Sequence, residues 1–369
     1  MCDDNKERKS DMDRKFDRKI VLENGQEYYG FGFGARTEKV CEVVFNTSMV
    51  GYQEVVSDLS YTDQMVVMTY PLIGNYGIAD EDFESKGTCL GALVVREYND
   101  LPSNFRCTQT LSETMEEYGV PGIEGIDTRK LTKYIRDNGC PMGLICDADK
   151  PVSEALEIIK NTPMAKDSVA KVSTKKKWHS RTVKHRFNVV LVDFGTRLSI
   201  VRALNAIGCN VSVVPWNASV EDIMALKPDG IFLSDGPGNP DDVPAAVELV
   251  KQLRGKCPIC GEGLGHQLMA IASGAKIERL PFGHRGSNHP VRILATGKIE
   301  IVSQNHGYTV TKDSLVGTGM TVTHENVLDG TVEGLECEEY KMFSTQYHPA
   351  VEAVHDKGFF EQFIEYMSK

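Results

Sequence analysis

The amino-acid sequence predicts an α/β protein in which an N-terminal mixed α/β domain is followed by a doubly wound domain. Its 369 residues exceed the ~250–300 at which a single hydrophobic core usually stops growing. From Phe187 onward, apolar strands alternate with amphipathic helices, an order typical of a parallel sheet with helices on both faces. The composition, 41% hydrophobic and 25% charged, is ordinary for a globular protein. Two domains are therefore expected.

The N-terminal part is predicted to contain a leader and a domain of short strands. Residues 1–17 are highly charged and lack the apolar core of a signal peptide, which predicts a disordered leader and a cytoplasmic protein. Over residues 18–152, short apolar runs such as VCEVVFNTS alternate with Gly, Asn and Pro, as strands and turns do. A helix is expected at DTRKLTKYIRDNG, because Leu131, Tyr134 and Ile135 recur at helical spacing.

Residues 153–186 are predicted to form a basic interdomain linker. A short helix, SEALEIIKNTP, precedes the run VAKVSTKKKWHSRTVKHR, which is dense in Lys, Arg and His. Such a run can contact a phosphate or an acidic partner. A solvated connector between two domains is the more common use of this composition.

The second domain, residues 187–369, is expected to place its site at one edge of a parallel sheet. The strands NVVLVDFG, CNVSVVPW, GIFLSDG and CPICG alternate with helices. Ligands of doubly wound sheets bind at the carboxyl ends of the strands. The loops SDGPGNP (234–240), GEGLGHQ (261–267) and QYHP (346–349) are therefore expected to form the site.

The turn GEGLG is typical of an elbow that carries a nucleophile, yet its middle residue is Gly263. Elbows between a strand and a helix usually present Ser or Cys at this position. Cys260 lies three residues earlier, on the strand, so its sulfur is expected to point into the sheet and not to replace the nucleophile. His348 follows a strand-like run and can act as an acid or base, although a structural role is the alternative.

Charge, hydropathy and cysteine spacing exclude several functions. A net charge of -11 argues against nucleic-acid binding. No apolar stretch approaches the ~20 residues of a membrane span. The ten cysteines show no disulfide framework. The Cys257–Cys260 pair has no second ligand pair for zinc, which predicts structural thiols.

Nine segments in both domains resemble the class I glutamine amidotransferase family, and in particular the small subunits of carbamoyl phosphate synthetase. They are VFNTSMVGYQEVVSD (44–58), MTYPLIGNYG (68–77), GIDTRKLTKYIRDNG (125–139), DFG (193–195), LSDGPGNP (233–240), GLGHQLMAIASGA (263–275), FGHRGSNHPV (282–291), SQNHGYTV (303–310) and QYHP (346–349). The resemblance implies a flavodoxin-like second domain, glutamine as ligand and a large partner subunit. It also implies a role in arginine and pyrimidine synthesis.

In that family a cysteine thiolate attacks the amide of glutamine, a histidine activates the thiol, and a glutamate orients the histidine. The resemblance implies that His348 is the base and acid, and that the amides of Gly238 and Leu264 stabilise the oxyanion. Residues implied to contact glutamine are Ser48, Gly236, Gly238, Leu264, Gln267, Asn305, Gly307 and Tyr308. No cofactor is expected on this chain, because ATP and magnesium belong to the large subunit.

Two departures from the family pattern affect the catalytic residues. The nucleophile position is Gly263, and the position of the orienting carboxylate is Ala350, with Glu352 two residues further on. Loss of a triad nucleophile costs about 10⁶ in rate. The chain is therefore predicted to be a small subunit without glutaminase activity. The alternatives are a competent subunit that carries a laboratory change at Gly263, and a non-enzymatic regulatory protein that reuses the pocket.

Two further features are assessed through the resemblance. The family usually has Lys-Arg-Asn where this chain has Arg197, Leu198 and Ser199. The histidines His284, His289 and His306 fall in loop motifs near the glutamine pocket, so no metal is expected there. These histidines could otherwise suggest a metal site.

Overall fold

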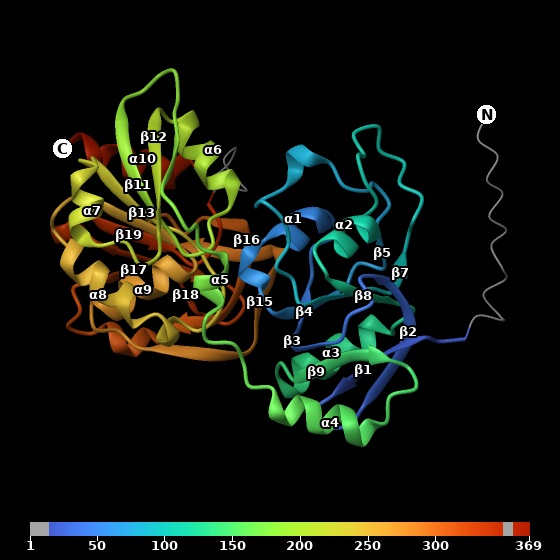
Figure 1. Ribbon diagram of the computed structural model, residues 1–369. Helices are drawn as coiled ribbons and strands as arrows, with labels where there is room; N and C mark the ends of the chain where they lie inside the picture. The colour runs from blue at the N-terminus through green and yellow to red at the C-terminus, as the bar shows by residue number, and fades with distance from the viewer. Residues whose placement is uncertain (1–14, 350–356) are drawn as a thin grey trace.

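The computed structural model describes residues 15–349 and 357–369 and contains two domains that lie side by side (Figure 1). Most of the predicted leader and both Ala350 and Glu352 fall outside the described residues. The mixed α/β character of the first domain and the doubly wound second domain are confirmed. Among the described helices, none is long and apolar enough to cross a membrane.

The first domain is built on a closed barrel with strand order β1-β2-β8-β6-β4-β3-β9. Its strands are β1 (Arg18–Leu22), β2 (Glu27–Gly34), β3 (Lys39–Asn46), β4 (Gln64–Met68), β6 (Ala92–Val94), β8 (Pro121–Glu124) and β9 (Met142–Asp147), and β5 (Leu72–Ile73) pairs with β7 (Glu97–Tyr98) outside the barrel. Three helices, α1 (Tyr52–Ser57), α2 (Leu111–Glu117) and α3 (Thr128–Asn138), pack around it. Closure removes the exposed strand edges.

Helix α3 forms where the apolar spacing predicted it. The Asp127 side chain accepts a hydrogen bond from the backbone N–H of Lys130 and caps the first turn. Leu131 and Ile135 are fully buried against the barrel, and Tyr134 is partly buried. The helix ends at Gly139, whose φ of 88° suits only glycine without strain.

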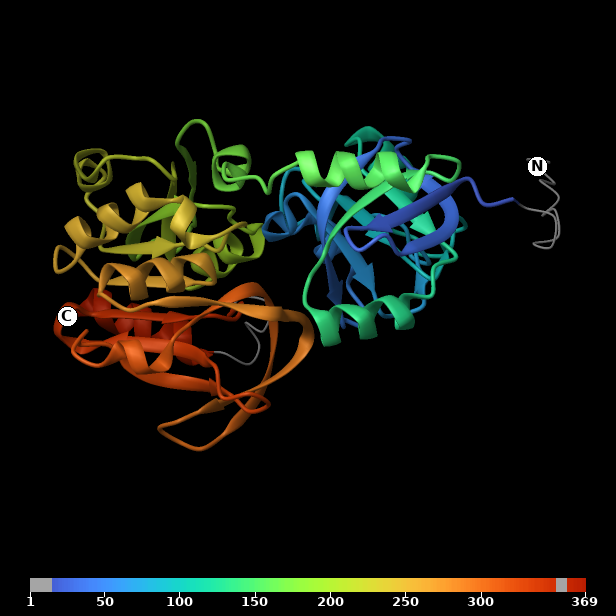
Figure 2. The same ribbon diagram turned by 90° about the horizontal axis from the view of Figure 1, so that it is seen from below.

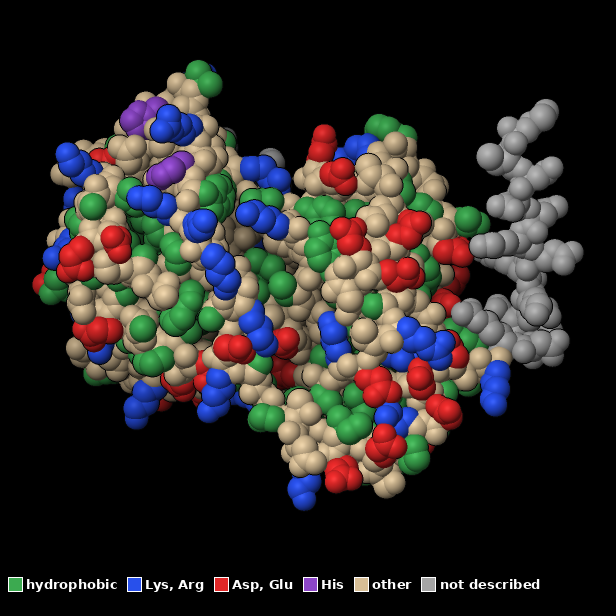
Figure 3. All heavy atoms as spheres, viewed as in Figure 1, with side chains coloured by type: hydrophobic (Ala, Val, Ile, Leu, Met, Phe, Trp, Pro, Cys, Tyr) green, Lys and Arg blue, Asp and Glu red, His purple; other side chains and the backbone are tan. Residues whose placement is uncertain are grey.

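The stretch 153–186 contributes ordered elements next to both domains. Helix α4 (Val152–Asn161) packs on β9 and β1, and α5 (Ser168–Val172) follows it. The short strand β10 (Trp178–Ser180) pairs antiparallel with the edge strand of the second domain. Residues 175–177 are exposed, and Figure 3 shows Lys and Arg side chains gathered on this face beside the boundary between the domains. The three lysines at 175–177 are therefore solvated, while other parts of the basic run belong to α5 and β10.

The second domain has a ten-stranded sheet whose parallel part has a flavodoxin-like order. The parallel strands run β12-β11-β13-β14-β19, which are β12 (Cys209–Pro215), β11 (Phe187–Asp193), β13 (Gly230–Leu233), β14 (Ile259–Glu262) and β19 (Met342–Thr345). Helices cover both faces: α7 (Val220–Ala225), α8 (Pro244–Leu253) and α9 (Leu264–Ala272) share one apolar core, and α6 (Leu198–Ala206) and α10 (Lys357–Ser368) share the other.

An antiparallel extension carries this sheet toward the barrel domain. Its strands are β15 (Ile277–Ile293), β16 (Ile299–Val310), β17 (Thr321–Asn326) and β18 (Val332–Cys337). The β15–β16 hairpin reaches from the parallel sheet to the first domain (Figure 2). There the Arg279 guanidinium pairs with Glu42, and Thr47 N donates to the Arg285 carbonyl. The loops at the carboxyl ends of the strands thus face the barrel domain.

Candidate functional site at the elbow

The turn between β14 and α9 has the strand–turn–helix geometry of a nucleophile elbow. Gly263 lies between Glu262, the last residue of the strand, and Leu264, the first of the helix. Its φ of 51° and ψ of -113° form a backbone conformation that residues with a side chain rarely adopt. The Gly263 N–H donates to the Thr345 carbonyl at 3.0 Å, which fixes the turn against β19.

The space beside Gly263 is filled by the carboxylate of Asp235, from the loop after β13. A Cβ built on Gly263 would lie 2.0 Å from Asp235 Oδ1. This oxygen accepts hydrogen bonds from the backbone N–H groups of Leu264 at 2.8 Å and Gly236 at 2.7 Å. The other oxygen, Oδ2, accepts from the hydroxyl of Ser60, in the barrel domain, at 3.1 Å. The backbone N–H groups of Leu264 and Gly236 are therefore already hydrogen-bonded to a negatively charged oxygen.

His348 lies behind this carboxylate and has two acidic neighbours. Its Nδ1 is 3.7 Å from Asp235 Oδ2 and 3.7 Å from Glu262 Oε2. The side chains of His348 and Glu262 are 3% and 0% exposed. Within residues 15–349 and 357–369, none of their side-chain nitrogen and oxygen atoms has a hydrogen-bond partner. Glu262 is thus a carboxylate next to the histidine of the predicted triad, at a position that the sequence analysis did not select.

Burial and neighbouring charges shift the pKa values of Asp235 and His348. Burial raises the pKa of Asp235 to about 6, with a further contribution from Glu262 and against the attraction of His348. Burial and Arg197 lower the pKa of His348, but Glu262 and Asp235 outweigh them, so it lies above its usual value. Below pH 6, Asp235 is therefore increasingly neutral.

Asp235→Asn is expected to raise the free energy of unfolding at pH 7.5 by about 1–3 kcal/mol. The ordinary pKa is 3.8 and the folded value is about 6. Folding thus takes up a proton between these values, and stability falls as pH rises through that window. The gain should vanish below pH 4, and urea unfolding at several pH values measures it. The exposed Asp241→Asn is the control, and an Asp235→Asn variant less stable at pH 7.5 would contradict the argument.

A cavity of about 790 Å³ opens in front of the elbow between the two domains. Of the residues expected to contact glutamine, those that line it are Gly236, Gly238, Gln267, Asn305, Gly307 and Tyr308. Ser48 and Leu264 are buried beside it and do not line it. Ser60 and Asp235 also line the cavity, so its wall carries a carboxylate.

The side-chain amides of two cavity residues are already held. Gln267 Nε2 donates to the Tyr308 carbonyl and to Gln346 Oε1, each at 3.0 Å. Asn305 Nδ2 donates to Asp58 Oδ2 at 3.1 Å, which links β16 to the barrel domain. Both amides are therefore fixed in orientation before any ligand enters, as a preorganised pocket requires.

Cys260 lies in the apolar core, as its place on the strand predicted. It is 0% exposed and packs in the cluster that contains Phe232 and Phe343. Burial raises the pKa of its thiol well above the usual value. Cys260 cannot supply a thiolate at the elbow.

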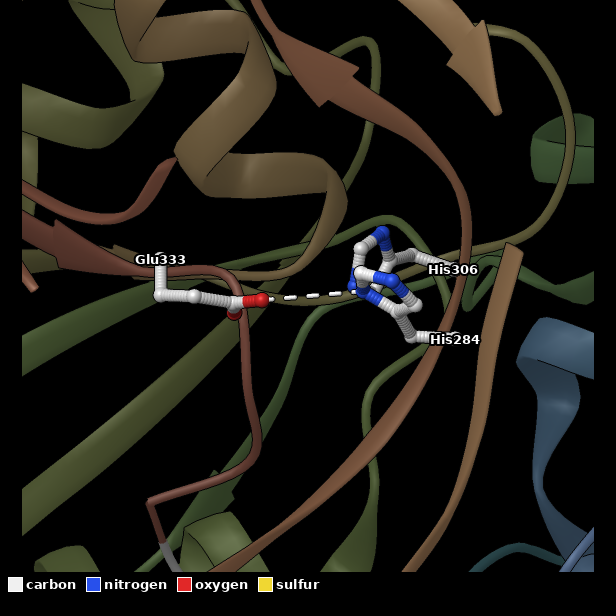
Figure 4. Close-up of side chains that lie close together, drawn as sticks. All are labelled: His284, His306 and Glu333. Atoms are coloured by element: carbon white, nitrogen blue, oxygen red, sulfur yellow. Dashed lines mark ion pairs between the residues drawn. The ribbon is translucent and has the colours of Figure 1, made fainter. Parts of the chain in front are cut away.

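The side chains of His284, His289 and His306 lie close together, near a carboxylate that the sequence analysis did not select. Figure 4 shows His284, His306 and Glu333, whose nearest ligand atoms lie within 4.8 Å of one another. His284 lies between Asp329, 2.9 Å from Nε2, and Glu333, 3.6 Å from Nδ1. Burial lowers the pKa of His284, but these carboxylates raise it to about 9 overall.

A protonated His284 satisfies both carboxylates, which explains the cluster as a buried ion pair. The neighbouring His289 and His306 have pKa values lowered by burial and by His284, so they are neutral. The sequence analysis expected no metal at these histidines, and that expectation stays a prediction.

Sequence reasoning missed the charged neighbours of His348. Asp235 stands inside the glycine-rich loop, and Glu262 is a carboxylate at the end of an otherwise apolar strand. A charged residue in a strand expected to be buried is a signal that could have selected Glu262. No local pattern indicates Ser60, because its approach depends on how the two domains pack.

Comparisons with known proteins agree with this architecture. Residues 20–145 match the model of the carbamoyl-phosphate synthase small chain, CPSase domain, and residues 190–366 match that of glutamine amidotransferase class-I. The chain is 49% identical over 352 residues to the carbamoyl phosphate synthase pyrimidine-specific small chain of Halalkalibacterium halodurans, covering 95% of this chain and 97% of that one.

Two other relatives have similar coverage. The carbamoyl phosphate synthase small chain of Staphylococcus epidermidis is 47% identical over 95% of this chain and 96% of its own length. That of Bacillus cereus is 50% identical over 91% of each chain. The matches extend through both domains and include the loops of the elbow site. The chain therefore belongs to the carbamoyl phosphate synthase small chain family.

Proposed function

We propose that this family member supports carbamoyl phosphate synthesis without hydrolysing glutamine. It would bind a large subunit that carries ATP and magnesium, and nitrogen would enter as free ammonia. The observation that carries the proposal is the elbow, where Gly263 offers no nucleophile and the Asp235 carboxylate lies where its side chain would stand. Loss of a triad nucleophile lowers the rate by about 10⁶.

Two further features support the absence of glutaminase chemistry. An amide carbonyl needs free N–H donors to stabilise its oxyanion. Here the N–H of Leu264, one of the two amides implied to stabilise the oxyanion, donates to Asp235, as does the N–H of Gly236. The sequence also has Ala350 at the position of the orienting carboxylate. This second departure argues against a competent enzyme with one laboratory change at Gly263, since that change would leave Ala350 unexplained.

The cellular role follows from the family. The printed name of one relative is pyrimidine-specific, and we propose pyrimidine and arginine precursor synthesis in the cytoplasm as the context. No cofactor is proposed for this chain, and no nucleic acid or membrane.

Co-expression with a large subunit tests the proposal. The purified complex should make carbamoyl phosphate from ATP, bicarbonate and ammonium chloride, and glutamine in place of ammonium should give less than about one thousandth of that rate. The ammonium reaction shows in the same preparation that the large subunit is active. Glutamine-driven synthesis at a rate comparable to the ammonium reaction would overturn the proposal, as would failure of the two chains to co-purify.

A further inference from the structure

We propose that the cavity at the elbow binds a protonated amine instead of the neutral amide of glutamine. The ligand is ammonium itself or an amino acid whose side chain ends in an ammonium group. The inference takes one point from the proposed function, which is that the protein does not hydrolyse glutamine. It assigns a ligand class to a site whose reactive residue is missing.

The first argument is the loss of what an amide carbonyl requires. Of the two amides implied to stabilise an oxyanion, those of Leu264 and Gly238, the N–H of Leu264 donates to Asp235 Oδ1, and so does the N–H of the neighbouring Gly236. A glutamine carbonyl that entered here would meet a carboxylate oxygen, which is also an acceptor, and the two would repel. An ammonium group has only donors, so the same oxygen attracts it.

The second argument is the excess of negative charge around the elbow. The buried charged side chains around the elbow and its cavity include the carboxylates Asp58, Glu84, Asp235 and Glu262 and the cations Arg197, Arg285 and His348. Four carboxylates against three cations leave one negative charge that these buried groups do not balance. Both oxygens of Glu262 lack a hydrogen-bond donor in the part of the chain that the structure describes. Because uncompensated buried charge is costly, a bound cation stabilises this arrangement.

The third argument is access. Asp235 lines the cavity of about 790 Å³ and lies between Ser60 and the elbow. Its Oδ2 accepts one hydrogen bond, from Ser60, and a carboxylate oxygen has lone pairs for two. The remainder of the wall has the polar residues expected for amino acid recognition, among them Gln267 and Asn305. The wall also carries other charged side chains, which include the ion pairs Glu42–Arg279 and Asp63–Lys171, but Asp235 is the carboxylate at the elbow.

Calorimetry on the full chain tests the inference with matched ligands. The probes are ammonium chloride against potassium chloride, L-2,4-diaminobutyrate against L-2-aminobutyrate, and glutamine. The two amino acids of the second pair differ by the ammonium group alone. Either ammonium chloride or diaminobutyrate should bind at least about tenfold more tightly than glutamine and than its own partner. The ligand pair that shows this difference in affinity tells whether the cavity binds free ammonium or an amino acid with an ammonium group.

Asp235→Asn keeps the size of the side chain and removes its charge, so the preference for amine should fall by about tenfold or more. Asp241→Asn, which changes another carboxylate of the cavity wall, should keep the preference within about twofold. Asp235→Ala, measured in the same way, serves if the Asn variant does not fold.

Three results would overturn the inference: glutamine bound as tightly as the amines, no binding of either amine, or an unchanged preference in the Asp235 variants. Glutamine hydrolysis by the complex is a separate result that would overturn the proposed function. Amine binding by the isolated chain can be measured whatever that assay gives.

Discussion

Gly263→Cys alone is expected to leave the protein inactive on glutamine and to lower its free energy of unfolding by about 2–5 kcal/mol. The new Cβ would stand 2.0 Å from Asp235 Oδ1 and 2.2 Å from its Cγ. The carboxylate must then move, and it would lose its bonds to Leu264 and Gly236. The residue must also hold a φ of 51°, which strains any side chain. A sulfur atom therefore does not restore an active elbow.

The double variant Gly263→Cys with Asp235→Ala separates the steric cause from the chemical one. Removing the carboxylate gives the Cys side chain space and frees both amides for an oxyanion. We expect the stability lost in the single variant to be largely recovered. A covalent glutamyl adduct should then become detectable by mass spectrometry, with slow turnover because position 350 is Ala.

Gly263→Ala is the matched control, since it has the same Cβ and no sulfur. It should be as destabilised as the single Cys variant in urea unfolding. Rapid glutamine hydrolysis by Gly263→Cys alone would show that Asp235 moves aside readily, and the steric argument would then be wrong.

The parallel part of the fold could be predicted because its signals are local. Apolar runs such as NVVLVDFG are buried on both faces of the sheet, and each is followed by an amphipathic helix. The barrel could not be predicted as a closed structure, because its short strands pair across long sequence separations, as β1 does with β9. The linker prediction included a short helix where α4 lies, but it missed β10, whose order depends on pairing with β12.

In the candidate site, too, the features set by local motifs could be predicted, and those set by contacts between distant segments could not. The elbow at Gly263 and the adjacent His348 follow from motifs, and the strand order brings them together at one edge of the sheet. The direction in which Asp235 points does not follow from any motif, because it depends on Ser60 in the other domain and on the absence of a side chain at Gly263. The glycine at 263 can therefore be interpreted only together with Asp235, whose carboxylate fills the space beside it.

The second large effect is expected at Glu84, in the barrel domain, where the two domains meet at the start of α6. Its carboxylate accepts from Ser199 N at 3.0 Å, and its backbone carbonyl accepts from Leu198 N at 2.7 Å. The Arg197 side chain, 7% exposed, lies 3.7 Å away through Nε. Glu84 therefore caps a helix of the second domain and balances a buried cation.

Glu84→Gln is expected to lower the free energy of unfolding by about 3 kcal/mol, because Arg197 would lose one of its buried counter-charges. Both tryptophans, Trp178 and Trp216, lie after the barrel. Their fluorescence during urea unfolding follows the second domain, while far-UV circular dichroism follows the whole chain. Glu81→Gln is the matched control, because the Glu81 side chain is 85% exposed and forms a surface ion pair with Arg106 at 3.8 Å. Its effect on the free energy of unfolding should stay below about 0.5 kcal/mol.

The double variant Glu84→Gln with Arg197→Met tests whether the cost lies in the stranded charge. Replacing both partners should destabilise by less than the sum of the single variants, because no buried cation remains without its carboxylate. If the two effects simply add, Glu84 stabilises through its helix cap alone. If Glu84→Gln shifts the urea unfolding transitions seen by circular dichroism and by fluorescence to the same extent, the contact couples the unfolding of both domains. A shift confined to fluorescence would place its contribution within the second domain.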